Sequence, residues 1–193
     1  MTKILYLHGF ASSADSTKAK VLESFVKKNT SSTKILIPNI DNNIKNAYQQ
    51  IEEIIKTESP SSIIGSSLGG FFGTYFSEKY NLLCVNINPA IPPIDMSEYL
   101  GENQNYSTGE KFFIDQDQLD FLALMNKKIK NLKNHKNFLT LLQSGDEVQI
   151  KIIKTINKGR ASIELVIAAQ PRSGGIAPAR PPMTIFCVPA NLR

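Results

Sequence analysis

Short apolar runs alternate along most of the chain with segments whose apolar residues recur at helical spacing. The apolar runs predict buried strands at residues 4–7, 35–37, 62–64, 82–87 and 137–142. Helical spacing predicts helices at residues 17–28, 42–56, 71–80 and 115–129. Strands that are apolar throughout and separated by helices are typical of a parallel sheet covered by helices on both faces. The pattern therefore predicts an α/β fold.

Small residues gather where the third predicted strand meets a helix. The sequence there is Gly65-Ser66-Ser67-Leu68-Gly69-Gly70, a G-x-S-x-G pattern with Ser67 at its centre. So tight a turn tolerates little side-chain bulk, and the helix N-terminus beside Ser67 favours a developing negative charge. The pattern alone fits equally a loop that binds phosphate or nothing, but a strand before it and a helix after it favour a nucleophile elbow. A Walker-type phosphate loop is disfavoured because no Lys-Ser or Lys-Thr follows the glycines.

Two other strands are predicted to end at the same edge of the sheet as Ser67. The strand at 4–7 leads into His8-Gly9-Phe10, and the strand at 137–142 leads toward Asp146. An acid at the carboxyl end of such a strand is where a catalytic carboxylate belongs.

Residues 89–113 are rich in proline and polar residues, and they interrupt the alternation of strands and helices. Such an insertion is often a lid or a substrate-contacting loop, but a solvated loop fits this composition equally well. Asp115, Asp117 and Asp120 follow it without the glycine and glutamate of a calcium loop. We expect these acids to favour the N-terminus of the helix at 115–129.

Composition narrows the class of protein. With 193 residues, 41% hydrophobic and 20% charged, the chain is predicted to form one globular domain. The net charge is +5, but residues 1–158 are nearly neutral, so a nucleic-acid partner is not indicated. No apolar run approaches the ~18 residues of a membrane span, and residues 4–7 are too short for a signal peptide. With Cys84 expected in the core and no disulfide framework, we expect a cytoplasmic protein.

Five motifs carry a resemblance to a known family: residues 5–13, Gly65–Gly70, Asn88-Pro89-Ala90, residues 101–110, and Gly145–Val148. In order and spacing they resemble α/β hydrolases and, among these, the small YqiA-like bacterial esterases, over residues 1 to about 148. The resemblance implies the α/β-hydrolase fold and a serine esterase acting on short acyl esters, with Ser67 as nucleophile and Asp146 as the acid of the triad. The backbone N–H groups of Phe10 and Leu68 would hold the oxyanion. A small-molecule ester is then the partner, with no cofactor and no metal ion.

The histidine that should complete the triad is missing from the pattern. Family order places it after the acid, yet the chain has only His8 and His135, both before Asp146. His8 is expected to hold its own loop by hydrogen bonding. His135 lies in a basic stretch at the wrong end of the strand that leads to Asp146. We therefore expect an inactive or strongly impaired esterase with an incomplete C-terminal strand and helix.

The C-terminal part also differs in composition. All 18 lysines lie at or before Lys158, all 4 arginines lie at or after Arg160, and 5 of the 10 prolines fall between Pro171 and Pro189. We interpret residues 1–148 as a hydrolase core with an insertion at about 89–125, and residues 149–193 as an aberrant tail produced by a frameshift or truncation followed by read-through. The alternative is a genuine divergent segment whose last strand is at 163–167.

Other functions use the same residues. A non-catalytic module could keep the hydrolase pocket and bind a small acyl ligand, and a thioesterase or acyltransferase would use the same machinery. A nucleotide-binding protein is the weakest alternative because no lysine follows the glycines and no acid is well placed for a ribose.

Overall fold

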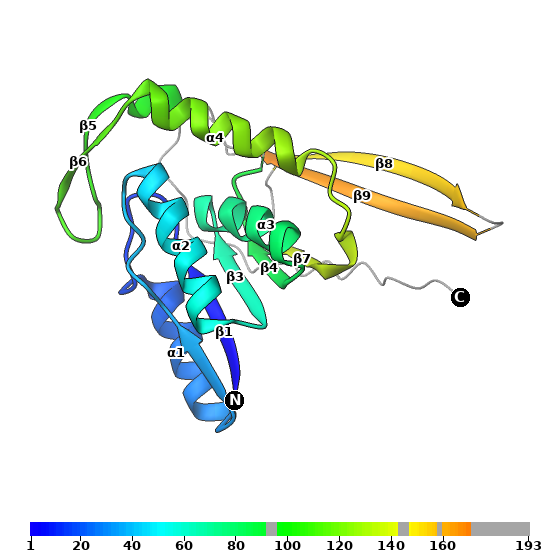
Figure 1. Ribbon diagram of the computed structural model, residues 1–193, viewed down its shortest axis with the longest axis horizontal. Coiled ribbons are helices and arrows are strands. Elements are labelled where there is room, and N and C mark those ends of the chain that lie inside the picture. The colour runs from blue at the N-terminus through cyan, green and yellow to red at the C-terminus, as the bar shows by residue number, and fades with distance from the viewer. Residues whose placement is uncertain (92–95, 143–146, 158–159, 171–193) are drawn as a thin grey trace.

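A five-stranded parallel sheet forms the centre of the molecule (Figure 1). The computed structural model describes residues 1–91, 96–142, 147–157 and 160–170. The strand order is β2-β1-β3-β4-β7. The strands are β1 (Thr2–Leu7), β2 (Thr33–Leu36), β3 (Ser62–Ser66), β4 (Leu83–Ile87) and β7 (Phe138–Leu141). Each lies at or within two residues of the predicted position, and their parallel pairing confirms the predicted α/β class.

Helices lie on both faces of this sheet, as predicted. They are α1 (Thr17–Asn29), α2 (Ile44–Glu58), α3 (Leu68–Tyr80) and α4 (Gln116–Ile129). Helix α3 packs on β1, β3 and β4, and α4 crosses over α2 and α3 (Figure 1). The Asp115 carboxylate accepts a hydrogen bond from the Gln118 N–H at 2.9 Å, so this acid caps α4 as predicted.

The two faces of the sheet are covered unequally. Leu5, Leu7 and Ile63 point toward α3 and are fully buried in the main core. Tyr6 points to the opposite face, where its hydroxyl interacts with Ser16 next to α1. Farther along that face, the Leu83 side chain is 59% exposed. Within the described residues, α1 therefore covers only the part of this face near β1 and β2.

The insertion after β4 is ordered where the structure describes it. A short 3-10 helix, η1 (Met96–Tyr99), precedes an antiparallel hairpin made of β5 (Gly101–Gln104) and β6 (Lys111–Ile114). The sequence was compatible with either a lid or a solvated loop in this segment, and neither alternative included this hairpin. Its own pairing and its contacts with the loop after β1 explain why a polar segment is ordered here.

Four further features bear on the sequence predictions. A second short helix, η2 (His135–Asn137), leads directly into β7, and β8 (Glu147–Asn157) pairs antiparallel with β9 (Arg160–Gln170) as a separate two-stranded sheet. Cys84 is a buried free thiol, as predicted. No helix in the described ranges has the length and apolar character needed to cross a membrane.

Candidate active site

Ser67 occupies a sharp turn between β3 and α3, and its backbone conformation is unusual. Its φ is 55° and its ψ is −121°, a region that residues with a Cβ rarely adopt. The turn is fixed on both sides. The Ser67 N–H donates to the Ile87 carbonyl at 3.1 Å, and the Ser67 carbonyl accepts from the N–H groups of Gly70 and Ala90 at 2.9 and 3.0 Å. Strain held by surrounding hydrogen bonds is typical of a nucleophile elbow.

Glycines allow the chain to approach itself closely around this turn. A Cβ at Gly65 would collide with the Gly69 carbonyl oxygen, and one at Gly69 would collide with the Leu7 carbonyl oxygen. Helix α3 can therefore begin directly against the ends of β1 and β3 only because both residues lack side chains. This close approach is the physical reason for the G-x-S-x-G spacing predicted from the sequence.

The loop after β1 lies against Ser67. A Cβ added at Gly9 would be 3.3 Å from the Ser67 Cβ and 3.7 Å from its Oγ, so the loop passes at van der Waals distance. Phe10 follows directly, and Leu68 follows Ser67 at the start of α3. Within the described part of the chain, neither the Phe10 N–H nor the Leu68 N–H has a hydrogen-bond acceptor assigned to it. Both predicted oxyanion donors thus come from the two segments that meet at Ser67.

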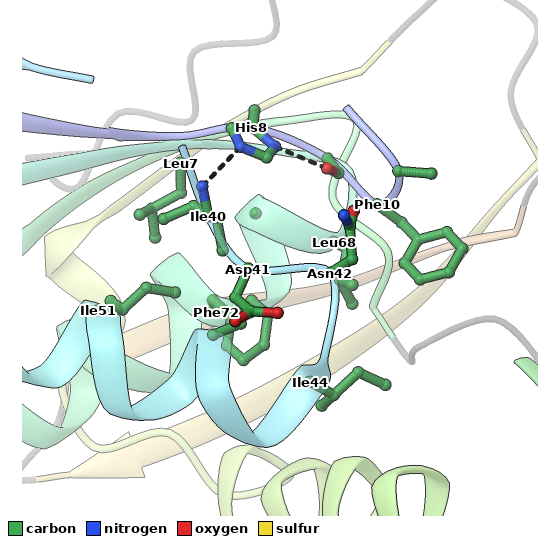
Figure 2. A pocket seen from close by; sticks show the side chains of 14 residues that line it. Leu7, His8, Phe10, Ile40, Asp41, Asn42, Ile44, Ile51, Leu68 and Phe72 are labelled. Atoms are coloured by element: carbon green, nitrogen blue, oxygen red, sulfur yellow. Dashed lines mark hydrogen bonds between the residues drawn. The ribbon is translucent and has the colours of Figure 1, made fainter. Parts of the chain in front are cut away.

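His8 is held by two backbone groups (Figure 2). Its Nε2 accepts a hydrogen bond from the Ile40 N–H at 2.9 Å, and its Nδ1 lies 2.9 Å from the Gly9 carbonyl oxygen. An accepting Nε2 carries no proton, so Nδ1 donates to Gly9 and the ring is neutral. Burial lowers the pKa of His8, which agrees with this neutral tautomer. Because both ring nitrogens are occupied, His8 positions the loop and has no nitrogen free to take a proton from Ser67.

The hairpin of β5 and β6 holds the outer side of this loop. The Phe10 ring makes edge-to-face contacts with Tyr99 and Phe112, at centroid distances of 5.0 and 5.4 Å. Asn105 is only 3% exposed, and its Nδ2 donates to the Ser12 carbonyl at 3.0 Å. The Tyr106 N–H donates to the Ala11 carbonyl at 3.0 Å. The insertion is thus bonded to the segment that carries a predicted oxyanion donor.

Cavities lie on both sides of the Gly9-Phe10 turn. The one shown in Figure 2 lies between His8, Ile44 and Phe72 and encloses about 20 Å³, room for about one water molecule. The one that contains Ser67 has a volume of about 400 Å³, within the range of small-molecule sites. It is lined by Tyr6, Gly9, Phe10, Ser12, Ser16, Thr17, Lys18, Ser66, Ser67, Leu68, Ala90, Met96, Tyr99 and Tyr106.

The structure gives less information on Asp146 and His135, the other residues that bear on the triad. Asp146 lies outside the described residues, so its role stays a prediction. Strand β7, which precedes it, ends level with β3 because Leu141 is in register with Ile87 and Ile87 with Ser66. His135 belongs to η2 at the start of β7. In a parallel sheet this is the edge opposite Ser67.

Comparison with known families supports the assignment made from the motifs. A family model matches residues 3–172. The chain belongs to Uncharacterised protein family (UPF0227). The match extends past residue 148, where the sequence resemblance ended. Membership of UPF0227, the YqiA-like family, confirms the resemblance to that family, and the mostly parallel sheet with helices on both faces agrees with the α/β class expected for it.

Solved structures similar to this UPF0227 chain include three hydrolases. Alpha/beta hydrolase domain-containing protein 10 from mouse is 16% identical with a TM-score of 0.40, and the match covers 46% of this chain and 41% of the mouse chain. Est1E from Butyrivibrio proteoclasticus, solved with ferulic acid bound, is 11% identical with a TM-score of 0.47 over 72% and 68% of the two chains. Carboxyl esterase 2 from the fungus Tuber melanosporum is 12% identical with a TM-score of 0.36 over 74% and 57%. This chain thus spans less than half the length of the mouse protein that it matches.

Two residues of the site were not predicted from the sequence. Asn105 bonds to Ser12, 93 positions earlier, and Lys18 lines the cavity that contains Ser67. Lys18 belongs to no recognisable motif, and Asn105 lies in the motif at residues 101–110, which carried the family resemblance without assigning a role to this residue. A buried asparagine within a polar insertion and a lysine in the first turn of a helix look the same in sequence whether they lie beside a site or far from it.

Proposed function

We propose that this chain carries the site of a serine carboxylic ester hydrolase of the α/β-hydrolase class, a site suited to short acyl esters, from which the triad histidine is missing. The observation that carries the proposal is the strained elbow at Ser67, which faces a cavity of about 400 Å³. Two backbone N–H groups without assigned acceptors, on Phe10 and Leu68, flank this serine. A nucleophile, a pair of oxyanion donors and room for a small substrate are the parts that acyl transfer requires.

In the proposed reaction the Ser67 Oγ attacks the ester carbonyl carbon. The carbonyl oxygen becomes an oxyanion and accepts hydrogen bonds from the N–H groups of Phe10 and Leu68. Collapse of this intermediate breaks the bond to the alcohol and leaves an acyl group on Ser67, which water then hydrolyses to release the carboxylic acid. The Ser67 proton must pass to a base and on to the leaving alcohol, with Asp146 proposed to orient that base.

The base is the part that this chain lacks. Both nitrogens of His8 are occupied by backbone groups, and His135 lies at the opposite edge of the sheet. Loss of the histidine from a serine triad costs about a million-fold in kcat by the subtilisin precedent, roughly 8 kcal/mol. We therefore expect this chain to be inactive or to turn over esters only at a trace rate.

Hydrolysis of p-nitrophenyl butyrate by the purified chain and by Ser67→Ala tests the proposal. Ser61→Ala is the matched control, since Ser61 is exposed at the other end of β3. We expect no difference between the three proteins at neutral pH. Any residual Ser67-dependent activity should increase steadily with pH, because hydroxide rather than a positioned histidine would have to remove the serine proton. A robust rate that Ser67→Ala abolishes would show that the chain has a base and would overturn the expected inactivity.

A second proposal is a non-catalytic module that binds a small acyl ligand. It is favoured by the combination of a cavity beside Ser67 with the absence of a usable histidine. Titration of the Ser67→Ala variant with butyrate, followed by NMR, would detect such binding without turnover. A thioesterase or acyltransferase uses the same residues, and parallel assays with butyryl thioesters and with added alcohol acceptors distinguish these from an ester hydrolase.

The origin of residues 149–193 is part of the same proposal. We propose that a frameshift or truncation shortly after Val148, followed by read-through, replaced a histidine-bearing ending. Sequencing the gene and its downstream DNA tests this directly. A histidine-bearing ending in another reading frame supports the proposal, and an uninterrupted native frame refutes it.

A further inference from the structure

The lining of the cavity that contains Ser67 includes a positive charge. Lys18 is the one charged residue among the described residues that line it. The hydroxyl-bearing side chains of Ser12, Ser16 and Thr17 also line the cavity. No aspartate or glutamate is among the described lining residues. The lining therefore offers positive charge and hydrogen-bond donors to whatever fills the cavity.

Lys18 has no acidic partner within the described part of the chain, whereas Lys20 and Lys27 of the same helix do. The Lys20 Nζ lies 3.4 Å from an Asp15 carboxylate oxygen, and Lys27 pairs with Glu23 at 2.9 Å. Both of these pairs are surface ion pairs that leave the cavity wall untouched. The charge of Lys18 thus remains available to a ligand.

Apolar and aromatic side chains also line the cavity. They include Phe10, Leu68, Met96 and Tyr99, and the Phe10 ring contacts the Tyr99 ring. Ser67 is another of the lining residues. A molecule that fills the cavity can therefore place an apolar part against these side chains and a polar end against Lys18.

We propose that the substrate of this site is an ester that carries a separate anionic group, a carboxylate or a phosphate, which pairs with Lys18 while the ester carbonyl lies at Ser67. The proposal rests on the proposed function for the position of the carbonyl. The pairing itself needs only the cavity and the lysine. A single partly exposed charge pair is worth about 1 kcal/mol, which corresponds to about a fivefold preference for an anionic over a neutral ligand.

The test uses binding to the full chain carrying Ser67→Ala, so that no probe is hydrolysed. Monomethyl glutarate, dimethyl glutarate and glycerol 3-phosphate are titrated in turn, with NMR shifts as the readout. We expect monomethyl glutarate to bind about fivefold more tightly than its neutral diester, and this preference to weaken as salt is added. Lys18→Met should abolish the preference without changing the affinity for dimethyl glutarate, and Lys18→Arg should retain it. Lys20→Met is the matched control on the same helix and should change nothing.

The two anion sources give different results. A Lys18-dependent affinity greater for glycerol 3-phosphate than for monomethyl glutarate assigns a phosphate, and the reverse assigns a carboxylate. Equal affinity for the monoester and the diester, or a preference that survives in Lys18→Met, overturns the proposal. Turnover is not part of this readout. A Lys18-dependent preference supports the anion site whether or not any Ser67-dependent hydrolysis is found, and Ser67-dependent hydrolysis without the preference would overturn the anion site while the hydrolase function stands.

Discussion

His8 fixes the loop beside Ser67 through two hydrogen bonds that only a neutral ring can make. The bond from the Ile40 N–H requires an unprotonated Nε2, and protonation would turn that acceptor into a second donor facing a donor. Because the ring is 5% exposed, the charged form would also lose its hydration. The state of this one ring therefore controls the path of the segment that contains Phe10.

This arrangement predicts a loss of stability in mild acid. Burial lowers the pKa of His8 in the folded state, while the unfolded chain has the ordinary value of about 6.5. Above that pH the His8 ring is neutral in both the folded and the unfolded state, so its contribution to the free energy of unfolding is fully present. As the pH falls below about 6.5, the unfolded state takes up a proton that the folded state refuses, so the free energy of unfolding decreases until the folded-state pKa is reached. Urea unfolding between pH 5 and 7.5 measures the decrease.

Two substitutions, His8→Phe and His135→Gln, test whether His8 is the source of this pH dependence of stability. His8→Phe leaves the Ile40 N–H without an acceptor and should cost about 1–3 kcal/mol at pH 7.5, but it should remove the part of the pH dependence that comes from His8. His135→Gln, as the control for the other histidine, should retain the dependence of the parent chain. The interpretation is wrong if His8→Phe loses as much stability between pH 7.5 and pH 5 as the parent does.

At the residue scale, the local sequence pattern was sufficient to predict the position of Ser67 in the site but not that of Lys18. The small residues around Ser67 are required by contacts within one turn and with the ends of neighbouring strands, so their spacing carries the prediction. The position of Lys18 beside Ser67 depends on how α1 lies against the sheet. No local rule fixes that orientation, and periodicity alone treats Lys18 as a solvated lysine.

The hairpin of β5 and β6 is the element that ties the insertion to the site. Asn105 follows β5 and bonds in three directions: to the Ser12 carbonyl, to Asn42 Oδ1 at 2.9 Å, and to the N–H groups of Ser107 and Thr108. The first two bonds use Nδ2 and reach other segments, while the last two use Oδ1 and stay within the hairpin turn. One side chain thus joins the hairpin to two loops at the carboxyl edge of the sheet.

Substitutions at Asn105 can separate these two roles. Asn105→Ala should lower the free energy of unfolding by about 2–3 kcal/mol, because it leaves several buried polar groups without partners. Asn105→Asp keeps the oxygen that holds the turn but removes the donors to Ser12 and Asn42. It should therefore speed hydrogen exchange of the Tyr106 amide, whose bond to the Ala11 carbonyl depends on the docked hairpin.

The matched control for the hairpin is Gln104→Ala, since Gln104 is exposed and, among the described residues, its side chain bonds only to the Gly109 carbonyl within the same hairpin. It should change stability by less than about 0.5 kcal/mol and leave Tyr106 exchange unaltered. If Asn105→Asp exchanges like the parent, the Nδ2 bonds do not dock the hairpin.

At the element scale, the sequence was informative about strands and helices with strong periodicity and uninformative about this insertion. Apolar runs such as residues 4–7 favour buried strands, so the approximate positions of the strands follow from hydrophobicity. The hairpin has a mixed, largely polar sequence, and it is ordered by contacts such as Asn105 with Ser12 that join segments far apart in the chain. Such contacts leave no periodic signal.

Within the part of the chain that the structure describes, the sheet has a continuous core on one face and a partly exposed opposite face. Side chains directed from the sheet toward α3 enter a continuous core that also contains residues of α2 and α4. On the opposite face, Leu83 and Leu139 are 59% and 37% exposed. Successive side chains along a strand point to opposite faces of the sheet, so leucines in similar apolar runs can be packed very differently.

Matched leucine substitutions measure this difference. Leu5→Ala, on the face toward α3, should lower the free energy of unfolding by about 2–5 kcal/mol because it leaves a cavity among fully buried side chains. Leu83→Ala makes the same chemical change on the opposite face and should cost less than about 1 kcal/mol, since the side chain loses little packing. Urea unfolding of both variants under identical conditions provides the comparison. Equal losses would mean that Leu83 is packed in solution, so that the sheet carries a second core of comparable strength.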